Sequence, residues 1–230
     1  MTSVHPPTPL KGIHDMEPRI EDEPRWPPAL AILAVLFLMI VLPHHVLVMP
    51  IWISRLVGLA VLVPMAAVAF TGNTRWLRIE RTTIMLAAGA YIANTIVELA
   101  DMIGIITLHP PESRAISLLS SSVAIWVANL LTFSLLYWQI DRGGPYARAS
   151  GLRLKPDWLF PQAGIPEDVP PNWRPLFLDY FSLGYNTATA FSPTDVLPLT
   201  RRAKMLMMLE STISLLTIVL VAARAVNVLP

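Results

Sequence analysis

The chain contains no cysteine, which excludes a disulfide framework and any metal or cluster held by thiolates. Charged residues are also scarce, at 14% of the 230 residues, whereas soluble globular proteins carry roughly 25%. The first residues lack the basic region and small-residue cleavage site of a signal peptide, so we expect the N-terminal segment to be retained. The net charge of +1 gives no sign of a nucleic-acid partner, and we expect none.

Hydrophobic residues dominate the composition instead. They make up 54% of the chain, and the mean hydropathy is +0.54. The sequence therefore predicts an all-α integral membrane protein with a single membrane domain. Residues 1–27 are acidic and rich in proline, and we expect them to form a disordered tail.

Five apolar stretches are long enough to cross about 30 Å of hydrocarbon as helices. They span residues 28–49, 51–71, 83–107, 115–140 and 203–228. The first four form two hairpins in a region that covers residues 28–140. A Pro-rich loop, 141–175, follows, and a pore-loop-like segment and the last helix occupy 176–230. We expect about five transmembrane helices with one re-entrant loop before the last.

Two local features bear on the boundaries of these helices. Asp141-Arg142-Gly143-Gly144-Pro145 predicts a helix stop, with the charged pair at the membrane interface and the glycines turning the chain. Trp138, Trp158 and Trp173 suit a belt of aromatic side chains at that interface.

The basic residues predict the orientation. If five helices alternate, nearly all Lys and Arg residues fall on the side of the N-terminus, the 72–82 loop and the 141–202 region. The opposite side has only Arg114 in a loop, with Arg55 and Arg224 near helix ends. The positive-inside rule places the basic side in the cytoplasm. We therefore expect a multi-pass protein of the cell inner (plasma) membrane with a cytoplasmic N-terminus.

The segment before the last helix has an unusual layout. Residues 176–191 are apolar but too few to cross a bilayer as a helix. Ser192-Pro193-Thr194-Asp195, then Pro198 and Thr200, a basic cluster and a long apolar helix follow. Short apolar stretches bounded by turn residues are candidates for re-entrant segments.

This layout resembles the pore domain of the potassium-channel superfamily. Asp195, Pro198 and Thr200 match the D-x-x-P-x-T that follows the filter in those channels, and Tyr180-Phe181-Ser182-Leu183 resembles the start of a pore helix. Residues 205–221 are similar to a bacterial inner helix, with Glu210 at a glutamate that such helices often carry and Ser214 where a hinge glycine is common. The resemblance implies a pore built by a homo-oligomer, for which a tetramer is one possibility.

The filter positions differ from those channels. The filter-like segment comprises Thr189, Ala190, Phe191, Ser192, Pro193, Thr194 and Asp195, and residues 190–194 stand where T-V-G-Y-G is expected. Potassium filters align successive carbonyl oxygens in a backbone that glycine permits. Pro193 fixes its own φ angle and Phe191 adds bulk, so we expect no potassium selectivity of that kind. Because the basic cluster surrounds this segment, the charge rule makes it enter from the cytoplasmic face.

Three further motifs resemble a family of uncharacterised bacterial integral membrane proteins with five predicted helices and a channel-like last third. The motifs are YWQIDRGGP at 137–145, DWLFPQ at 157–162 and NTATAFSPTD at 186–195. The resemblance covers most of residues 50–230. This resemblance implies membership of a family but no function, because the members of that family are uncharacterised.

Ionisable residues within the apolar helices are a second candidate site. Asn94, Glu98 and Asp101 are spaced i, i+4, i+7 and therefore share one helix face. Arg55 lies at a similar depth on the preceding helix. An Arg55–Asp101 ion pair, an ion or proton pathway through Glu98 and Asp101, and placement at water-exposed helix ends are the alternatives.

Glu210 is the other acidic residue in this class. It lies near the cytoplasmic end of the last helix. The two alternatives are a structural role, either capping the pore helix or pairing with Arg201 or Arg202, and ion coordination.

The sequence shows no catalytic site. It has no nucleophile–base pair and no metal-ligand cluster, and His44-His45 fits a helix-hairpin turn, so we expect no enzyme, metal or cofactor. The predicted function is a channel-like pore with a non-potassium filter, weakly selective for small cations. The alternatives are a non-conducting membrane subunit or scaffold and a proton-coupled transporter. The expected partners are the lipid bilayer, further copies of the chain and small cations.

Overall fold

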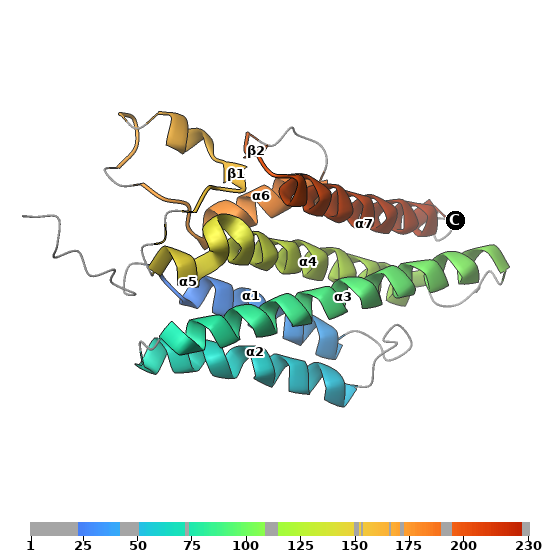
Figure 1. The fold of residues 1–230 in the computed structure, drawn as a ribbon. Coiled ribbons are helices and arrows are strands. Elements are labelled where there is room, and N and C mark those ends of the chain that lie inside the picture. The colour runs from blue at the N-terminus through green and yellow to red at the C-terminus, as the bar shows by residue number, and fades with distance from the viewer. Residues whose placement is uncertain are drawn as a thin grey trace, which may run out of the picture.

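The computed structural model describes residues 23–41, 51–71, 74–108, 115–149, 152, 154–165, 167–170, 173–189 and 195–226. Most of these residues are helical, and the long helices run side by side in alternating directions (Figure 1). The helices are α1 (Trp26–Val41), α2 (Ile51–Thr71), α3 (Thr74–Leu108), α4 (Ala115–Ile140), α5 (Gly144–Ala149), α6 (Phe177–Thr189) and α7 (Arg201–Val226). The short elements are the 3-10 turns η2 (Asp141–Gly143) and η3 (Pro161–Gly164) and the antiparallel strands β1 (Trp158–Leu159) and β2 (Leu197–Pro198).

Three helical stretches among the described residues are long and apolar enough to cross a membrane. They are Arg75–Ala100, Ser122–Arg148 and Arg201–Ala222. Two shorter apolar stretches, Trp26–Leu38 and Leu56–Thr71, belong to α1 and α2. The helices support a multi-pass membrane protein, with three such spans where the sequence predicted about five. The end of the first predicted span, 42–49, lies outside the described residues.

α3 begins at Thr74, well before the predicted start at residue 83. Its first turns are amphipathic, because Leu77 and Glu80 are buried whereas Arg78 is exposed. Glu80 accepts hydrogen bonds from Arg25 at 2.8 and 3.0 Å, which satisfies its charge inside the fold. The prediction followed only the apolar run and therefore missed these turns.

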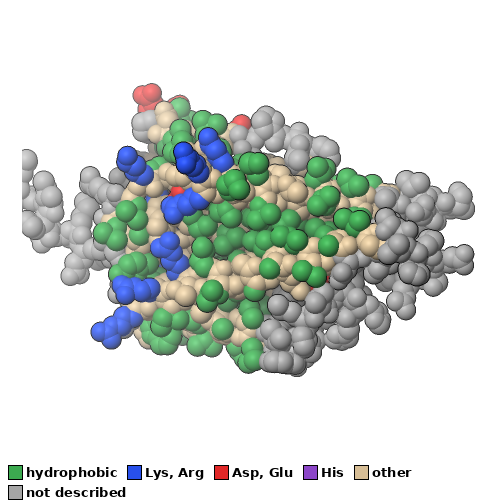
Figure 2. Space-filling model, turned by 45° about the vertical axis from the view of Figure 1, so that its right-hand side comes forward, with side chains coloured by type: hydrophobic (Ala, Val, Ile, Leu, Met, Phe, Trp, Pro, Cys, Tyr) green, Lys and Arg blue, Asp and Glu red, His purple; other side chains and the backbone are tan. Residues whose placement is uncertain are grey.

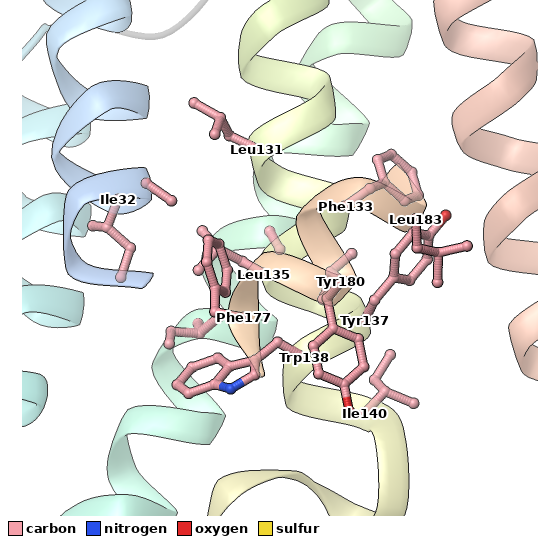
Figure 3. Close-up of a cluster of buried hydrophobic side chains, with 14 of the residues drawn as sticks. Ile32, Leu131, Phe133, Leu135, Tyr137, Trp138, Ile140, Phe177, Tyr180 and Leu183 are labelled. Atoms are coloured by element: carbon pink, nitrogen blue, oxygen red, sulfur yellow. The ribbon is translucent and has the colours of Figure 1, made fainter. Parts of the chain in front are cut away.

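α4 forms the centre of the bundle and contacts α1, α3, α6 and α7. In the apolar stretch of α4, 78% of the residues are buried, compared with 33% in that of α3 and 28% in that of α7. Every residue from 128 to 141 is buried, as expected for a helix that is apolar on all sides. Figure 3 shows Phe133 and Tyr137 of α4 beside Leu183 of α6 in this core. The outer faces of α3 and α7 instead carry the exposed apolar side chains of Leu86, Val97, Met208, Leu215 and Val219.

The described Lys and Arg side chains gather at one end of the molecule (Figure 2). The starts of α1, α3 and α7 and the end of α4 lie at this basic end (Figure 1). The one-sided distribution expected from the sequence is therefore present in the described part of the chain.

The predicted helix stop is found at the end of α4. Arg142, Gly143 and Gly144 have φ angles of 52°, 79° and 82°. A Cβ atom at Gly144 would overlap the carbonyl oxygen of Gln139, so the turn requires glycine there. The expected interfacial position of Asp141 is wrong, because this side chain is fully buried among α6 and the 157–158 segment.

Candidate functional site

Two of the three motif segments, 137–145 and 157–162, meet the start of α6 at the buried carboxylate of Asp141. Its Oδ1 atom accepts a hydrogen bond from the backbone N–H of Asp157 at 2.7 Å, and a longer one from Trp158 at 3.4 Å. Its Oδ2 atom accepts one from the Tyr180 hydroxyl at 2.7 Å. Asp141 directly follows α4, and Tyr180 lies in the first turn of α6. One carboxylate therefore joins α4, the β1 segment and α6.

Asp157 makes the second connection, to the start of α7. This carboxylate is fully buried and accepts two hydrogen bonds from Arg202, from Nε and Nη2, each at 2.6 Å. It also accepts the Thr200 hydroxyl at 2.6 Å. Thr200 in turn accepts the backbone N–H of Ala203 at 3.3 Å, as a helix N-cap does. The pairing of β1 with β2 reinforces this junction.

A third group of contacts holds residues 23–25 against the same end. Glu23 accepts hydrogen bonds from the indole N–H of Trp138 at 2.6 Å and from Arg148 Nη2 at 2.9 Å. The guanidinium groups of Arg25 and Arg148 lie 5.7 and 5.9 Å from the centre of the Trp138 ring. The part of the expected tail that is described is thus packed on the bundle, and residues 1–22 lie outside the described residues.

We call Asp141, Asp157, Tyr180, Thr200 and Arg202 the carboxylate junction. Burial raises the pKa of the Tyr180 hydroxyl well above its usual value, although the nearby Arg148 guanidinium acts in the opposite direction. Tyr180 therefore stays protonated and donates a hydrogen bond to Asp141. The junction has the chemistry of a fixed support for α6 and α7, since its donors and acceptors are paired with one another.

The predicted interfacial belt of tryptophans is wrong for two of its three members. Trp138 and Trp158 are fully buried, and Trp173 is half-buried. Trp138 donates to Glu23, whereas the Trp158 indole N–H points to the sulfur of Met207 at 3.4 Å. Their polar atoms find partners inside the protein and have no need of the membrane surface.

The filter-like segment is described only at its two ends. Thr189 closes α6, and its hydroxyl donates to the carbonyl of Tyr185 at 2.9 Å. Asp195 is exposed and lies two residues before the start of β2. Ala190, Phe191, Ser192, Pro193 and Thr194 lie outside the described residues. The last turn of α6 is held to α7, because the Ser211 hydroxyl donates to the Thr187 carbonyl at 3.1 Å.

The predicted polar face of α3 is present in part. Asn94 and Glu98 are both buried, and the Asn94 amide donates to Glu98 Oε1 at 2.6 Å. The side chains of Arg55 and Asp101 lie outside the described residues, and so does the ion pair proposed between them.

Glu210 does not pair with Arg201 or Arg202. Arg202 binds Asp157 instead, and Glu210 lies two helical turns further along α7, about 12 Å away at 1.5 Å per residue. Glu210 is fully buried against α4, where it accepts a short hydrogen bond from the Tyr137 hydroxyl. One turn further, the Asn129 amide donates to the Ser214 hydroxyl at 2.9 Å across the same pair of helices. Glu210 and Ser214 of α7 therefore face α4.

The carboxylate junction was not predicted as a site. The available signal was an acidic residue within each of two motifs, Asp141 after a long apolar helix and Asp157 in a Pro-rich loop. Among the described residues, no group of three or more His, Cys, Asp or Glu side chains is arranged to hold a metal ion.

Comparisons of the chain with protein-family models, with curated proteins and with solved structures found no match.

Proposed function

We propose that this chain is a channel-like membrane protein in which the segment from α6 to β2 forms a pore loop. The observation that carries the proposal is the path of this segment. α6 starts beside Asp141 and ends beside Ser211 of α7, whereas β2 and the start of α7 lie back beside β1 and Asp157 (Figure 1). With 13 residues, α6 is about 20 Å long, too short for a bilayer.

The carboxylate junction supports such a loop because it fixes both ends of it. Tyr180, at the entry, is bonded to Asp141, and Arg202, at the exit, is bonded to Asp157. The two carboxylates belong to adjoining segments, since Asp141 also accepts the backbone N–H of Asp157. A loop that must hold its shape at membrane depth needs this kind of rigid attachment, because lipid offers no hydrogen bonds to an irregular backbone.

The proposed pore is weakly selective for small cations. Residues 190–194 lack the glycines that let a potassium filter align its carbonyl oxygens. Asp195 is exposed at the end of this segment, where its charge raises the local concentration of cations. One loop per chain forms a pore only when several chains surround an axis, so the proposal includes a homo-oligomer. The positive-inside rule makes the loop enter from the cytoplasmic side.

A non-conducting scaffold is the second candidate. The observation in its favour is that the motif residues Asp141 and Asp157 bind other parts of the same chain. Such residues hold a fold together without requiring conduction.

Currents through the reconstituted protein in planar bilayers distinguish the two candidates. We expect a cation current that Asp195→Asn lowers, most strongly at low salt, where screening is weak. Asp168→Asn removes another exposed carboxylate and is the matched control, with no expected effect. Strong selectivity for potassium over sodium would contradict the filter argument. Absence of current from a verified oligomer, over a range of voltage and pH, would favour the scaffold.

A further inference from the structure

Glu210 occupies an unusual environment for an acidic side chain. It is 0% exposed and lies between α4 and α6. Its Oε2 atom accepts the hydrogen bond from Tyr137, whereas its Oε1 atom is buried without a hydrogen-bond partner among the described residues. A buried carboxylate normally has both oxygen atoms paired, because leaving one without a donor is unfavourable.

No described cation balances this carboxyl group. Three other buried or half-buried acids pair with arginine, namely Glu80 with Arg25, Glu23 with Arg148 and Asp157 with Arg202. Glu210 takes part in none of the ion pairs between described residues. Within the described part of α4, α6 and α7, the titratable group that faces it is the neutral hydroxyl of Tyr137.

On the side of α6, Oε1 lies beside Gly184. The helices pack closely there, because a Cβ atom at Gly184 would overlap the Ser134 hydroxyl oxygen at 2.6 Å and would lie 3.4 Å from Oε1. The Ser134 proton is already donated to the Leu130 carbonyl at 2.7 Å. The Thr187 hydroxyl likewise donates to the Leu183 carbonyl, at 2.8 Å. An ionised Oε1 therefore has no hydrogen-bond donor among the described residues.

We propose that Glu210 is a proton-binding site at the junction of α4, α6 and α7. Its carboxyl group carries a proton when the helices pack as described, and loss of that proton to water leaves a negative charge without a counter-ion. Ser211, the residue after Glu210, makes the hydrogen bond to Thr187 that holds the end of α6 to α7. Deprotonation of Glu210 therefore weakens the attachment of α6. The contact of α6 with α7 is therefore sensitive to pH, whether or not the chain conducts.

Infrared spectroscopy of the full-length protein in lipid vesicles tests the protonation directly. At a pH where exposed carboxylates are ionised, we expect the C=O stretch of a protonated carboxylic acid, shifted by exchange into D₂O. Glu210→Gln should remove this band, whereas Glu167→Gln, at an exposed position, should leave it unchanged. A band that Glu210→Gln leaves unchanged in intensity, or the absence of the band from the wild type, overturns the proposal.

Thermal unfolding at several pH values gives a second, independent measurement. A proton bound more tightly in the folded state than in the unfolded state stabilises the fold at low pH and is lost as the pH rises. The melting temperature of the wild type should therefore fall towards alkaline pH more steeply than that of Glu210→Gln, whose amide is neutral throughout. Equal slopes would contradict the proposal. If the melting temperature rose with sodium or potassium concentration in the wild type but not in Glu210→Gln, a cation would occupy the site in place of the proton, and the proposal would be wrong.

Discussion

The bond between Tyr180 and Asp141 offers the sharpest test of the carboxylate junction. Tyr180→Phe removes one hydroxyl and leaves the buried ring in place. The donor lies 2.7 Å from a carboxylate that is fully buried, and hydrogen bonds to charged groups contribute about 1.5–3 kcal/mol net. Asp141 keeps its bond from the backbone of Asp157, so we expect a loss of about 2 kcal/mol in the free energy of unfolding.

The same helix supplies the control. Tyr185 lies on α6 as well but is exposed, and Tyr185→Phe should change the free energy of unfolding by no more than about 0.5 kcal/mol. The assay is equilibrium unfolding in mixed detergent micelles, followed by circular dichroism. Equal effects of the two substitutions would refute the role assigned to Tyr180.

A double-mutant cycle with Asp141→Asn then isolates the pair. A neutral partner reduces the bond to about 1 kcal/mol, so Tyr180→Phe should cost about 1 kcal/mol less in the Asp141→Asn background. Strict additivity of the two substitutions would mean that the hydroxyl and the carboxylate do not interact in the folded protein.

The remaining predictions concern orientation and buried charge. Since the chain has no cysteine, single cysteines at Arg78, Arg153 and Pro230 report sidedness cleanly; a membrane-impermeant reagent on intact cells should label only position 230. Labelling of position 153 but not of 230 would reverse the orientation. If Arg55 and Asp101 pair, removing either alone should destabilise the protein by about 3–5 kcal/mol, and removing both should restore much of the folded yield. Equal damage from single and double substitutions would show that they do not interact.

The local features of the fold could be predicted from the sequence. Apolar runs indicated the helices, because burying backbone polar groups in lipid leaves few other structures. The Gly143-Gly144-Pro145 stop was predictable because only glycine fits the positive φ angles that turn the chain. The contact between Asn94 and Glu98 followed from helical spacing alone.

The long-range pairs could not be predicted in this way. Asp157 binds Arg202 across 45 positions of sequence, and Glu80 binds Arg25 across 55. No periodic pattern connects such residues, and their burial depends on how the helices assemble. The prediction of the tryptophan belt was wrong for the same reason. The sequence around an aromatic residue near a helix end does not show whether the side chain faces the membrane interface or the protein interior. The pairing of Glu210 with Arg201 or Arg202, one of the alternatives, rested on proximity in sequence, whereas its partner Tyr137 lies 73 positions away on α4.

The arrangement of the pore loop in an oligomer is the central claim, and a structure of the full-length protein in lipid nanodiscs tests it most directly. We predict several copies around one axis, with the 189–195 segments of all copies meeting at that axis and α7 beside them. A monomer, or an oligomer whose 189–195 segments point away from the axis, would contradict the channel-like function.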